Sequence, residues 1–234
     1  MRSKLTTLIL ACTVLAGAAA AAQAAPIAVA VYTFQSRDDV NAFQKVSAGS
    51  CKRHWAGNQA LSLTIGASTN NCTFRSSVVA DSSDQHADQG MVASATVAGP
   101  SKKLQLKSFV GVGVRQSDSA SYVLRVIPFK HKWQYLRDPK GPGGPKVEAA
   151  GTGKFVKIGS KPNTIAIRAF SYGGANTSVI ASVNGHGVVS TTDSGPDQPD
   201  GGRTVVTTGA KGSGAATGIR GVFDNVTVLV PNPF

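Results

Sequence analysis

The chain has 234 residues, of which 41% are apolar and only 15% are charged, with 26 glycines and 11 prolines. This composition disfavours intrinsic disorder and a helical bundle, and it favours turn-rich β structure. The formal net charge is +12, and Glu148 is the one glutamate among the 12 acidic residues. A mechanism that needs two glutamates is therefore excluded.

A secretory leader is predicted at the N-terminus. Arg2 and Lys4 precede an apolar stretch over residues 5–22, which reaches an Ala-Gln-Ala sequence at residues 22–24. These are the parts of a secretory signal in their usual order. We therefore expect a signal peptide over residues 1–24 and a single secreted domain over residues 25–234. Loss of the two basic residues lowers the net charge from +12 to +10. No later stretch has the ~18–20 apolar residues that a transmembrane helix needs.

The positive charge suggests attraction to a polyanion, with a solvated surface that keeps an exported domain soluble as the alternative. Lysines concentrate at residues 102–107 and again, with His131 and Arg137, at residues 130–140. Both groups fall between strand-like segments and match no nucleic-acid-binding motif, so we expect no nucleic-acid partner.

The mature chain keeps two cysteines, Cys51 and Cys72, which are 21 residues apart. An even pair in an oxidising compartment predicts a disulfide, because a metal role would need further ligands at suitable spacing and none stand nearby.

One short helix is expected after Ser36, a plausible N-cap ahead of Val40 and Phe43. About eleven β-type runs follow, separated by turn residues. They cover residues 61–65, 74–79, 91–97, 104–114, 122–129, 133–136, 155–158, 164–170, 178–183, 204–207 and 222–230. Asn184 and Gly185 are expected to form a tight hairpin turn. No helical segments alternate with the runs, so the predicted fold is all-β, with two packed antiparallel sheets.

The order of these segments is similar to that of a known superfamily. Residues 110–137, "VGVGVRQSDSASYVLRVIPFKHKWQYLR", resemble the central hairpins of concanavalin A-like (LamG-like) jelly-roll domains. "NTIAIRAF", "VIASVNGHGVV" and "IRGVFDNVTVLVP" resemble the last strands of that superfamily. The resemblance implies a jelly-roll β-sandwich over nearly the whole mature chain, and it identifies a fold rather than an activity.

Carboxylates constrain the possible chemistry. Glucanases of this superfamily use a Glu-x-Asp-x-x-Glu strand, because retaining hydrolysis needs two carboxylates about 5–5.5 Å apart. The chain lacks this motif, and Glu148 is expected at the surface. The stretch "DSSDQHAD", with Asp81, Asp84, His86 and Asp88, is interpreted as a polar loop rather than a metal site. No cofactor is expected, although a structural calcium there or at Asp224 stays open as an alternative.

Candidate ligand-binding residues come from the strand over residues 132–137. Trp133, Tyr135 and Arg137 share one parity, which would place them on one face, with Leu136 on the other. Arg115 and Arg125 end or interrupt the adjoining runs, so the predicted binding residues are Trp133, Tyr135, Arg115, Arg125 and Arg137. In the alternative interpretation, the two rings cover the core and the arginines cap the sheet edge. The His54-Trp55 pair beside Cys51 is the second candidate.

The sequence thus predicts a secreted, non-catalytic β-sandwich that binds carbohydrate or another extracellular polymer, with a preference for acidic ligands. Two alternatives stay open. The first is a polysaccharide lyase acting on uronate polymers with Tyr122, Tyr135 or His131 as base, although the Arg-x-Glu-x-Arg and Gln-Ile-His strings of alginate lyases are absent. The second is a structural protein of the cell envelope or matrix.

Overall fold

The computed structural model describes residues 27–47, 49–56, 59–79, 88–117, 120–138, 145–159, 161–171, 176–199, 202–212 and 216–230. The predicted leader lies outside these described residues. So do Asp81, Asp84 and His86 of the acidic loop.

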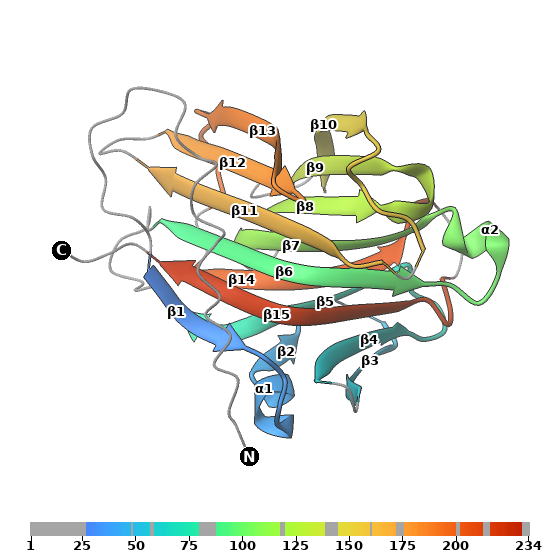
Figure 1. Cartoon of the computed structure of the whole chain (residues 1–234). Helices are drawn as coiled ribbons and strands as arrows, with labels where there is room; N and C mark the ends of the chain where they lie inside the picture. The colour runs from blue at the N-terminus through green and yellow to red at the C-terminus, as the bar shows by residue number, and fades with distance from the viewer. Residues whose placement is uncertain are drawn as a thin grey trace, which may run out of the picture.

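Two antiparallel sheets pack face to face, as the sequence predicts (Figure 1). The eight-stranded sheet has the order β13-β12-β11-β6-β15-β4-β3, with β1 also paired to β15. Its strands are β1 (Ile27–Tyr32), β3 (Cys51–Ala56), β4 (Ala60–Ile65), β6 (Gln89–Ala98), β11 (Asn163–Ser171), β12 (Thr177–Val183), β13 (His186–Asp193) and β15 (Arg220–Val230).

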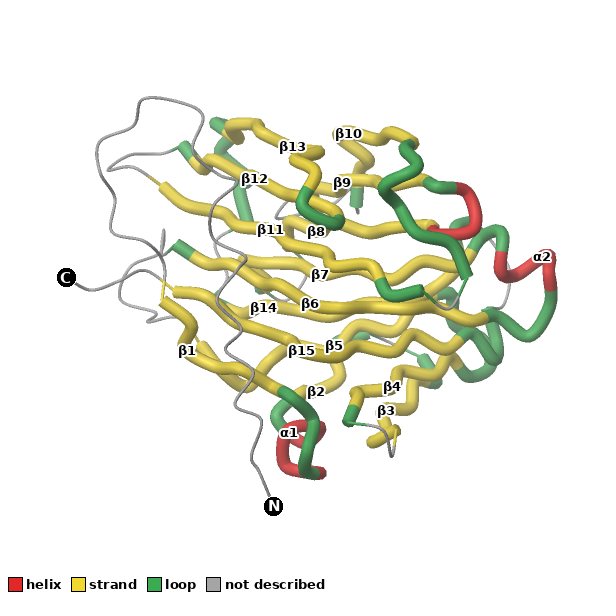
Figure 2. Tube along the Cα trace, viewed as in Figure 1, coloured by secondary structure: helices red, strands yellow, loops and turns green. Residues whose placement is uncertain are grey.

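The seven-stranded sheet has the order β10-β9-β8-β7-β14-β5-β2. Its strands are β2 (Phe43–Lys45), β5 (Asn71–Val79), β7 (Ser108–Gln116), β8 (Ser121–Ile127), β9 (Lys132–Asp138), β10 (Lys146–Thr152) and β14 (Arg203–Ala210). The helical elements are short: α1 (Arg37–Asn41), α2 (Lys102–Gln105) and a 3-10 turn, η1 (Pro128–Lys130) (Figure 2). No helix among the described residues is long and apolar enough to cross a bilayer.

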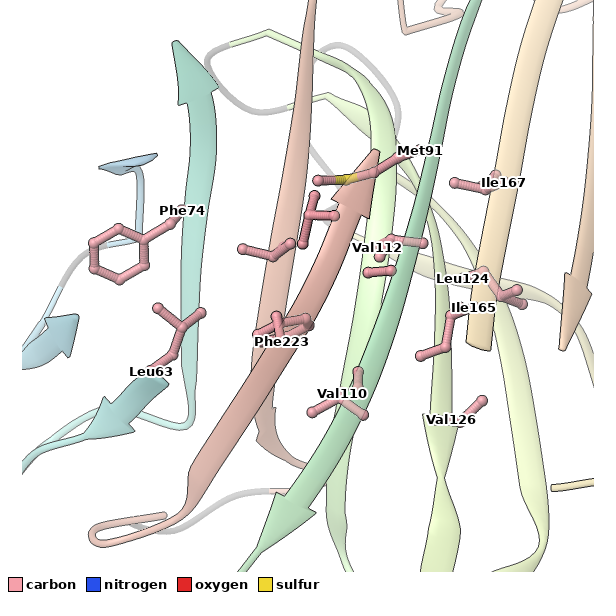
Figure 3. Packing of buried hydrophobic residues seen from close by; sticks show 14 of the residues in the cluster. Leu63, Phe74, Met91, Val110, Val112, Leu124, Val126, Ile165, Ile167 and Phe223 are labelled. Carbon is pink, nitrogen blue, oxygen red and sulfur yellow. The ribbon is translucent and has the colours of Figure 1, made fainter. Parts of the chain in front are cut away.

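The core lies between the two sheets because each strand turns every second side chain inward. In β11, Ile165, Ile167 and Ala169 are buried while the residues between them are partly exposed. Figure 3 shows side chains from both sheets meeting in this layer. The labelled members are Leu63, Phe74, Met91, Val110, Val112, Leu124, Val126, Ile165, Ile167 and Phe223. Full burial of one such large side chain contributes about 1.5–3 kcal/mol to folding.

The predicted disulfide is confirmed. Cys51 and Cys72 are bonded, with their Cα atoms 5.6 Å apart. Cys51 belongs to β3 at the edge of the eight-stranded sheet, whereas Cys72 belongs to β5 of the seven-stranded sheet. The bond therefore links the two sheets covalently.

Several local predictions are confirmed. The helix α1 follows Ser36, but the Ser36 side chain makes no capping hydrogen bond, and the helix ends before Phe43, which begins β2. Asn184 and Gly185 form the hairpin turn with φ angles of 51° and 81°. Glu148 is exposed on β10, as predicted. Of the "DSSDQHAD" stretch, Asp88 lies within the described residues and pairs with Arg168.

Other boundaries differ from the predictions. Residues 104 and 105, predicted as the start of a strand, belong to α2, because the Ser101 side chain caps this helix by accepting a hydrogen bond from the Leu104 N–H at 3.3 Å. Residues 155–158 are a turn rather than a strand. The strand before this turn is β10, which the sequence does not predict because its residues are largely exposed and do not alternate between apolar and polar.

Candidate functional site

A groove crosses the outer face of the seven-stranded sheet. It has a volume of about 590 Å³ and runs over β9, β8, β7, β14 and β5. It is lined by Val46, Ser47, Gly49, Ser68, Thr69, Asn70, Asn71, Thr73, Phe109, Gln116, Ser121, Val123, Arg125, Leu136, Asp138, Pro145, Val205 and Thr207. The groove therefore lies on the side of the sheet that faces away from the core.

The floor of the groove is a small apolar row across four neighbouring strands. Leu136 lies opposite Val123, Val123 opposite Gly113, and Gly113 opposite Val205. A Cβ atom at Gly113 would lie 2.8 Å from the Tyr122 carbonyl oxygen and from Val205 Cγ2. Glycine at this position therefore leaves no side chain projecting into the groove and lets the neighbouring strands approach closely.

A polar row runs beside the apolar floor. In register across the strands, this row passes through Gln134, Arg125, Gly111, Thr207 and Thr73. Of these, Arg125, Thr207 and Thr73 line the groove. The hydroxyl oxygens of Thr73 and Thr207 are 3.0 Å apart and hydrogen-bonded. Hydroxyl, amide and guanidinium groups along an apolar floor are the combination that sugar recognition uses.

Arg125 is fixed in this row by two neighbours. Its Nε and Nη2 atoms donate to Gln134 Oε1 at 3.2 and 3.0 Å. Its guanidinium lies 4.6 Å from the centroid of the Phe109 ring, a cation–π contact. Burial lowers the pKa of Arg125 to about 10, so the group stays positively charged at neutral pH. The groove therefore holds a fixed cation.

A carboxylate lies at the end of the groove away from Arg125. Asp138, the last residue of β9, lies opposite Ser121 of β8. Burial raises the pKa of the Asp138 carboxyl. Among the described residues that line the groove, Asp138 is the one carboxylate, and no Tyr or His is present.

Trp133, Tyr135 and Arg137 share one face of β9, as predicted, but this face is turned toward the other sheet. Tyr135 is 2% exposed, lies in the core and stacks on Tyr122 with ring centroids 6.4 Å apart. Trp133 is half-buried and packs against the core. The structure thus places both rings as the alternative interpretation described, while Leu136 lies under the groove on the other face.

Arg137 is held by Asp193, the last residue of β13, and by Asp197, which follows it. It forms ion pairs with Asp193 and, at 2.7 Å, with Asp197. The Tyr122 hydroxyl donates to Asp193 Oδ2 at 2.8 Å. Burial and the neighbouring Asp193 carboxylate both raise the pKa of Tyr122. This network joins β8 and β9 to β13 of the opposite sheet.

Arg115 lies inside the sandwich because of a bulge. The pairing register between β7 and β14 shifts between Arg203 and Val205, and Arg115 has a φ of 54°. The side chain is 1% exposed and donates to Thr177 Oγ1 at 2.7 Å and Ser171 Oγ at 2.9 Å. Of the predicted binding residues, Arg125 alone lines the groove, and the others do not join it in one surface.

The second candidate, His54-Trp55, lies on β3 of the other sheet. His54 is exposed, while the indole Nε1 of Trp55 donates to the Phe34 carbonyl oxygen at 2.7 Å. Among the described residues, no group of three His, Cys, Asp or Glu side chains is placed to hold a metal ion. Asp224 accepts hydrogen bonds from the backbone and side chain of Asn225.

The comparison with known proteins finds similarity in three dimensions only. No family model matches the sequence. No curated protein matches it either. Among solved structures, the chain is similar to an endo-1,3-beta-glucanase from Streptomyces sioyaensis, with a TM-score of 0.60 and 13% identity over 92% of this chain and 100% of that one. It is also similar to a protein of unknown function with a galectin-like fold from Bacillus subtilis, with a TM-score of 0.59 and 10% identity over 90% and 99% of the two chains.

The chain has the concanavalin A-like jelly-roll fold. A third structure with this fold is the carbohydrate-binding module CBM66 from Bacillus subtilis, with a TM-score of 0.50 and 12% identity over 80% of this chain and 95% of that one. These three structures thus include an enzyme and a binding module, and the two names that state a role both refer to carbohydrate. At these identities the likeness shows the fold alone.

Proposed function

We propose that the protein is an exported, non-catalytic carbohydrate-binding domain whose groove holds a glycan chain with acidic sugars. The observation that carries the proposal is the fixed position of Arg125, held by Gln134 and Phe109 beside an apolar floor. The floor suits the apolar face of a pyranose, and the hydroxyl and amide groups beside it suit sugar hydroxyls. Arg125 supplies a charge-assisted hydrogen bond to a carboxylate.

The groove favours binding over lyase chemistry. A lyase needs a base that removes a proton from the sugar ring, and its geometry must bring that base within hydrogen-bond reach. Tyr122 and Tyr135 turn toward the interior, where Tyr122 is hydrogen-bonded to Asp193. His131 contacts the Val156 carbonyl oxygen at 2.7 Å in a loop beyond the groove residues.

Export is the second part of the proposal. It rests on the predicted leader over residues 1–24, on the domain that follows it over residues 25–234, and on the disulfide between Cys51 and Cys72, which suits an oxidising compartment. The expected location is therefore extracellular or periplasmic.

The test compares the binding of matched neutral and uronate-containing oligosaccharides by titration calorimetry at two salt concentrations. Arg125→Gln should weaken uronate binding by about 10- to 100-fold, the value of a hydrogen bond to a charged group. Arg125→Lys should keep part of the affinity. Arg53→Gln, which changes an arginine on β3 of the other sheet, is the control and should bind like the parent.

Three outcomes would contradict the proposal. The first is unchanged uronate binding by a folded Arg125→Gln variant. The second is binding that disappears at the higher salt for every ligand, which indicates charge attraction alone. The third is the ultraviolet absorbance of an unsaturated uronate, which would show that the protein is a lyase.

A further inference from the structure

One end of the sandwich carries lysines without acidic residues, whereas at the other end arginines pair with aspartates. No Asp or Glu occurs in four connections at the first end. They are α2 with its flanks (99–107), η1 with its flanks (128–132), the β10–β11 loop (153–162) and the β14–β15 loop (211–219). Asp88, Asp138 and Asp193 lie at the other ends of β6, β9 and β13. We call the first region the lysine end. Its members are Lys102, Lys103, Lys107, Lys130, Lys132, Lys154, Lys157, Lys161 and Lys211.

Strand register and hydrogen bonds bring these connections together. The backbone N–H of Lys211 donates to the Lys107 carbonyl oxygen at 2.9 Å, and the N–H of Gly153 donates to the His131 carbonyl oxygen at 2.9 Å. The last residue of β14, Ala210, lies opposite Ser108, the first residue of β7. Figure 1 shows α2 at the right-hand end, where β6 finishes and β7 begins.

The loops that carry the lysines are held by the fold. Asn163 Oδ1 accepts from the Lys157 N–H at 2.8 Å and Asn163 Nδ2 donates to the Lys157 carbonyl oxygen at 2.9 Å. In α2, Gln105 Nε2 donates to the Gly99 carbonyl oxygen at 3.1 Å. The lysine side chains themselves are exposed, apart from the half-buried Lys132. In the described part of the chain, none of them forms an ion pair.

Apolar side chains project among these lysines. Leu106, between Lys103 and Lys107, is 40% exposed, and Ile158, next to Lys157, is 49% exposed. A large apolar side chain exposed beside uncompensated lysines is the pattern of proteins that lie on anionic bilayers, where the cations meet headgroups and the apolar groups enter the interface. A soluble polyanion would use the lysines but would leave Leu106 and Ile158 in water.

We infer that the lysine end docks the protein on an anionic lipid membrane, with Leu106 and Ile158 in the headgroup region. This inference does not rest on the groove. The groove opens on the face of the seven-stranded sheet, whereas the lysine end faces along the strands. A docked molecule would therefore stand on its end and keep the groove open to a glycan beside the membrane.

The test measures sedimentation of the mature protein with vesicles of phosphatidylcholine alone and of phosphatidylcholine mixed with phosphatidylglycerol. We expect binding only to the mixed vesicles. The triple variant Lys102→Gln, Lys103→Gln, Lys107→Gln should bind them on the order of 100-fold more weakly, since each lysine near an anionic surface contributes roughly fivefold. The double variant Leu106→Ser, Ile158→Ser should lose roughly tenfold or more.

A matched control removes the same charge elsewhere, by Arg37→Gln, Arg53→Gln and Lys146→Gln, and should bind nearly as well as the parent. Arg125→Gln should also bind vesicles like the parent, which separates this surface from the groove. Two results would overturn the inference: equal losses in the control and lysine triple variants, or full vesicle binding by the double variant. The latter, together with binding of soluble polygalacturonate that depends on the lysines, would identify a polyanion site instead. Melting temperatures check that each variant is folded.

Discussion

Removal of the disulfide should cost the protein about 3 kcal/mol of unfolding free energy. Cys51 and Cys72 are separated by 21 residues. On the chain-entropy model, a cross-link of this span lowers the entropy of the unfolded chain by about 11 cal/mol/K, which corresponds to about 3.3 kcal/mol at 25 °C. The structure adds a local expectation, because among the described strands β3 pairs with β4 alone, and the disulfide ties it to the other sheet.

The assay is urea unfolding of the Cys51→Ala, Cys72→Ala variant beside the oxidised parent. The urea concentration at the midpoint of unfolding should fall, while the slope of the unfolding free energy against urea concentration stays similar. Native-state hydrogen exchange should show faster exchange in β3, with the amides of the central strands still protected to the level of global unfolding. Reductant should destabilise the parent and leave the variant unchanged. A loss below about 1 kcal/mol, or faster exchange spread evenly over both sheets, would refute the reasoning.

Two further predictions concern the residues around the groove. Trp133→Ala should lower the unfolding free energy by about 2–3 kcal/mol, since the half-buried ring packs on the core, and calorimetry should find glycan affinity close to that of the parent. Strong loss of affinity with unchanged stability would instead place a ligand on that ring. Asp138→Asn should raise the melting temperature at neutral pH. Burial raises the pKa of Asp138 in the folded protein above its value in the unfolded chain. The free energy of unfolding therefore falls as the pH rises from below the normal aspartate pKa through the pKa of the folded protein. The gain should vanish in acid, where both forms are neutral, and a gain independent of pH would contradict this cause.

Much of the sandwich follows from short-range sequence patterns. The run predicted over residues 104–114 is a strand from Ser108 onward, and its "VGVGV" alternation matches the structure, where Val110, Val112 and Val114 face the core and Gly111 and Gly113 lie on the face of the groove. Parity likewise groups Trp133 with Tyr135. Parity does not say which face is inner, and this depends on the partner strand, where Tyr135 lies opposite the inward-facing Leu124.

Other site features depend on contacts that sequence does not contain. The bulge that buries Arg115 is set by the register of β14, which is some 90 residues away in the chain. Thr73 and Thr207 meet in the groove only because β5 and β14 are neighbours. The sequence shows the lysine end only as separate basic runs. These runs come together in space because of the order of the strands in the two sheets.

The last two strands occupy the centre of the sandwich. β14 lies between β7 and β5, and β15 lies between β6 and β4 while also pairing with β1 (Figure 1). Ile27 thus lies opposite Val230, and these are the first and last of the described residues. Such long-range pairing slows folding, because the entropy of closing the chain is lost before the contacts form. A chain still being synthesised lacks the middle of both sheets, so the sandwich can be completed only after its C-terminal strands have emerged.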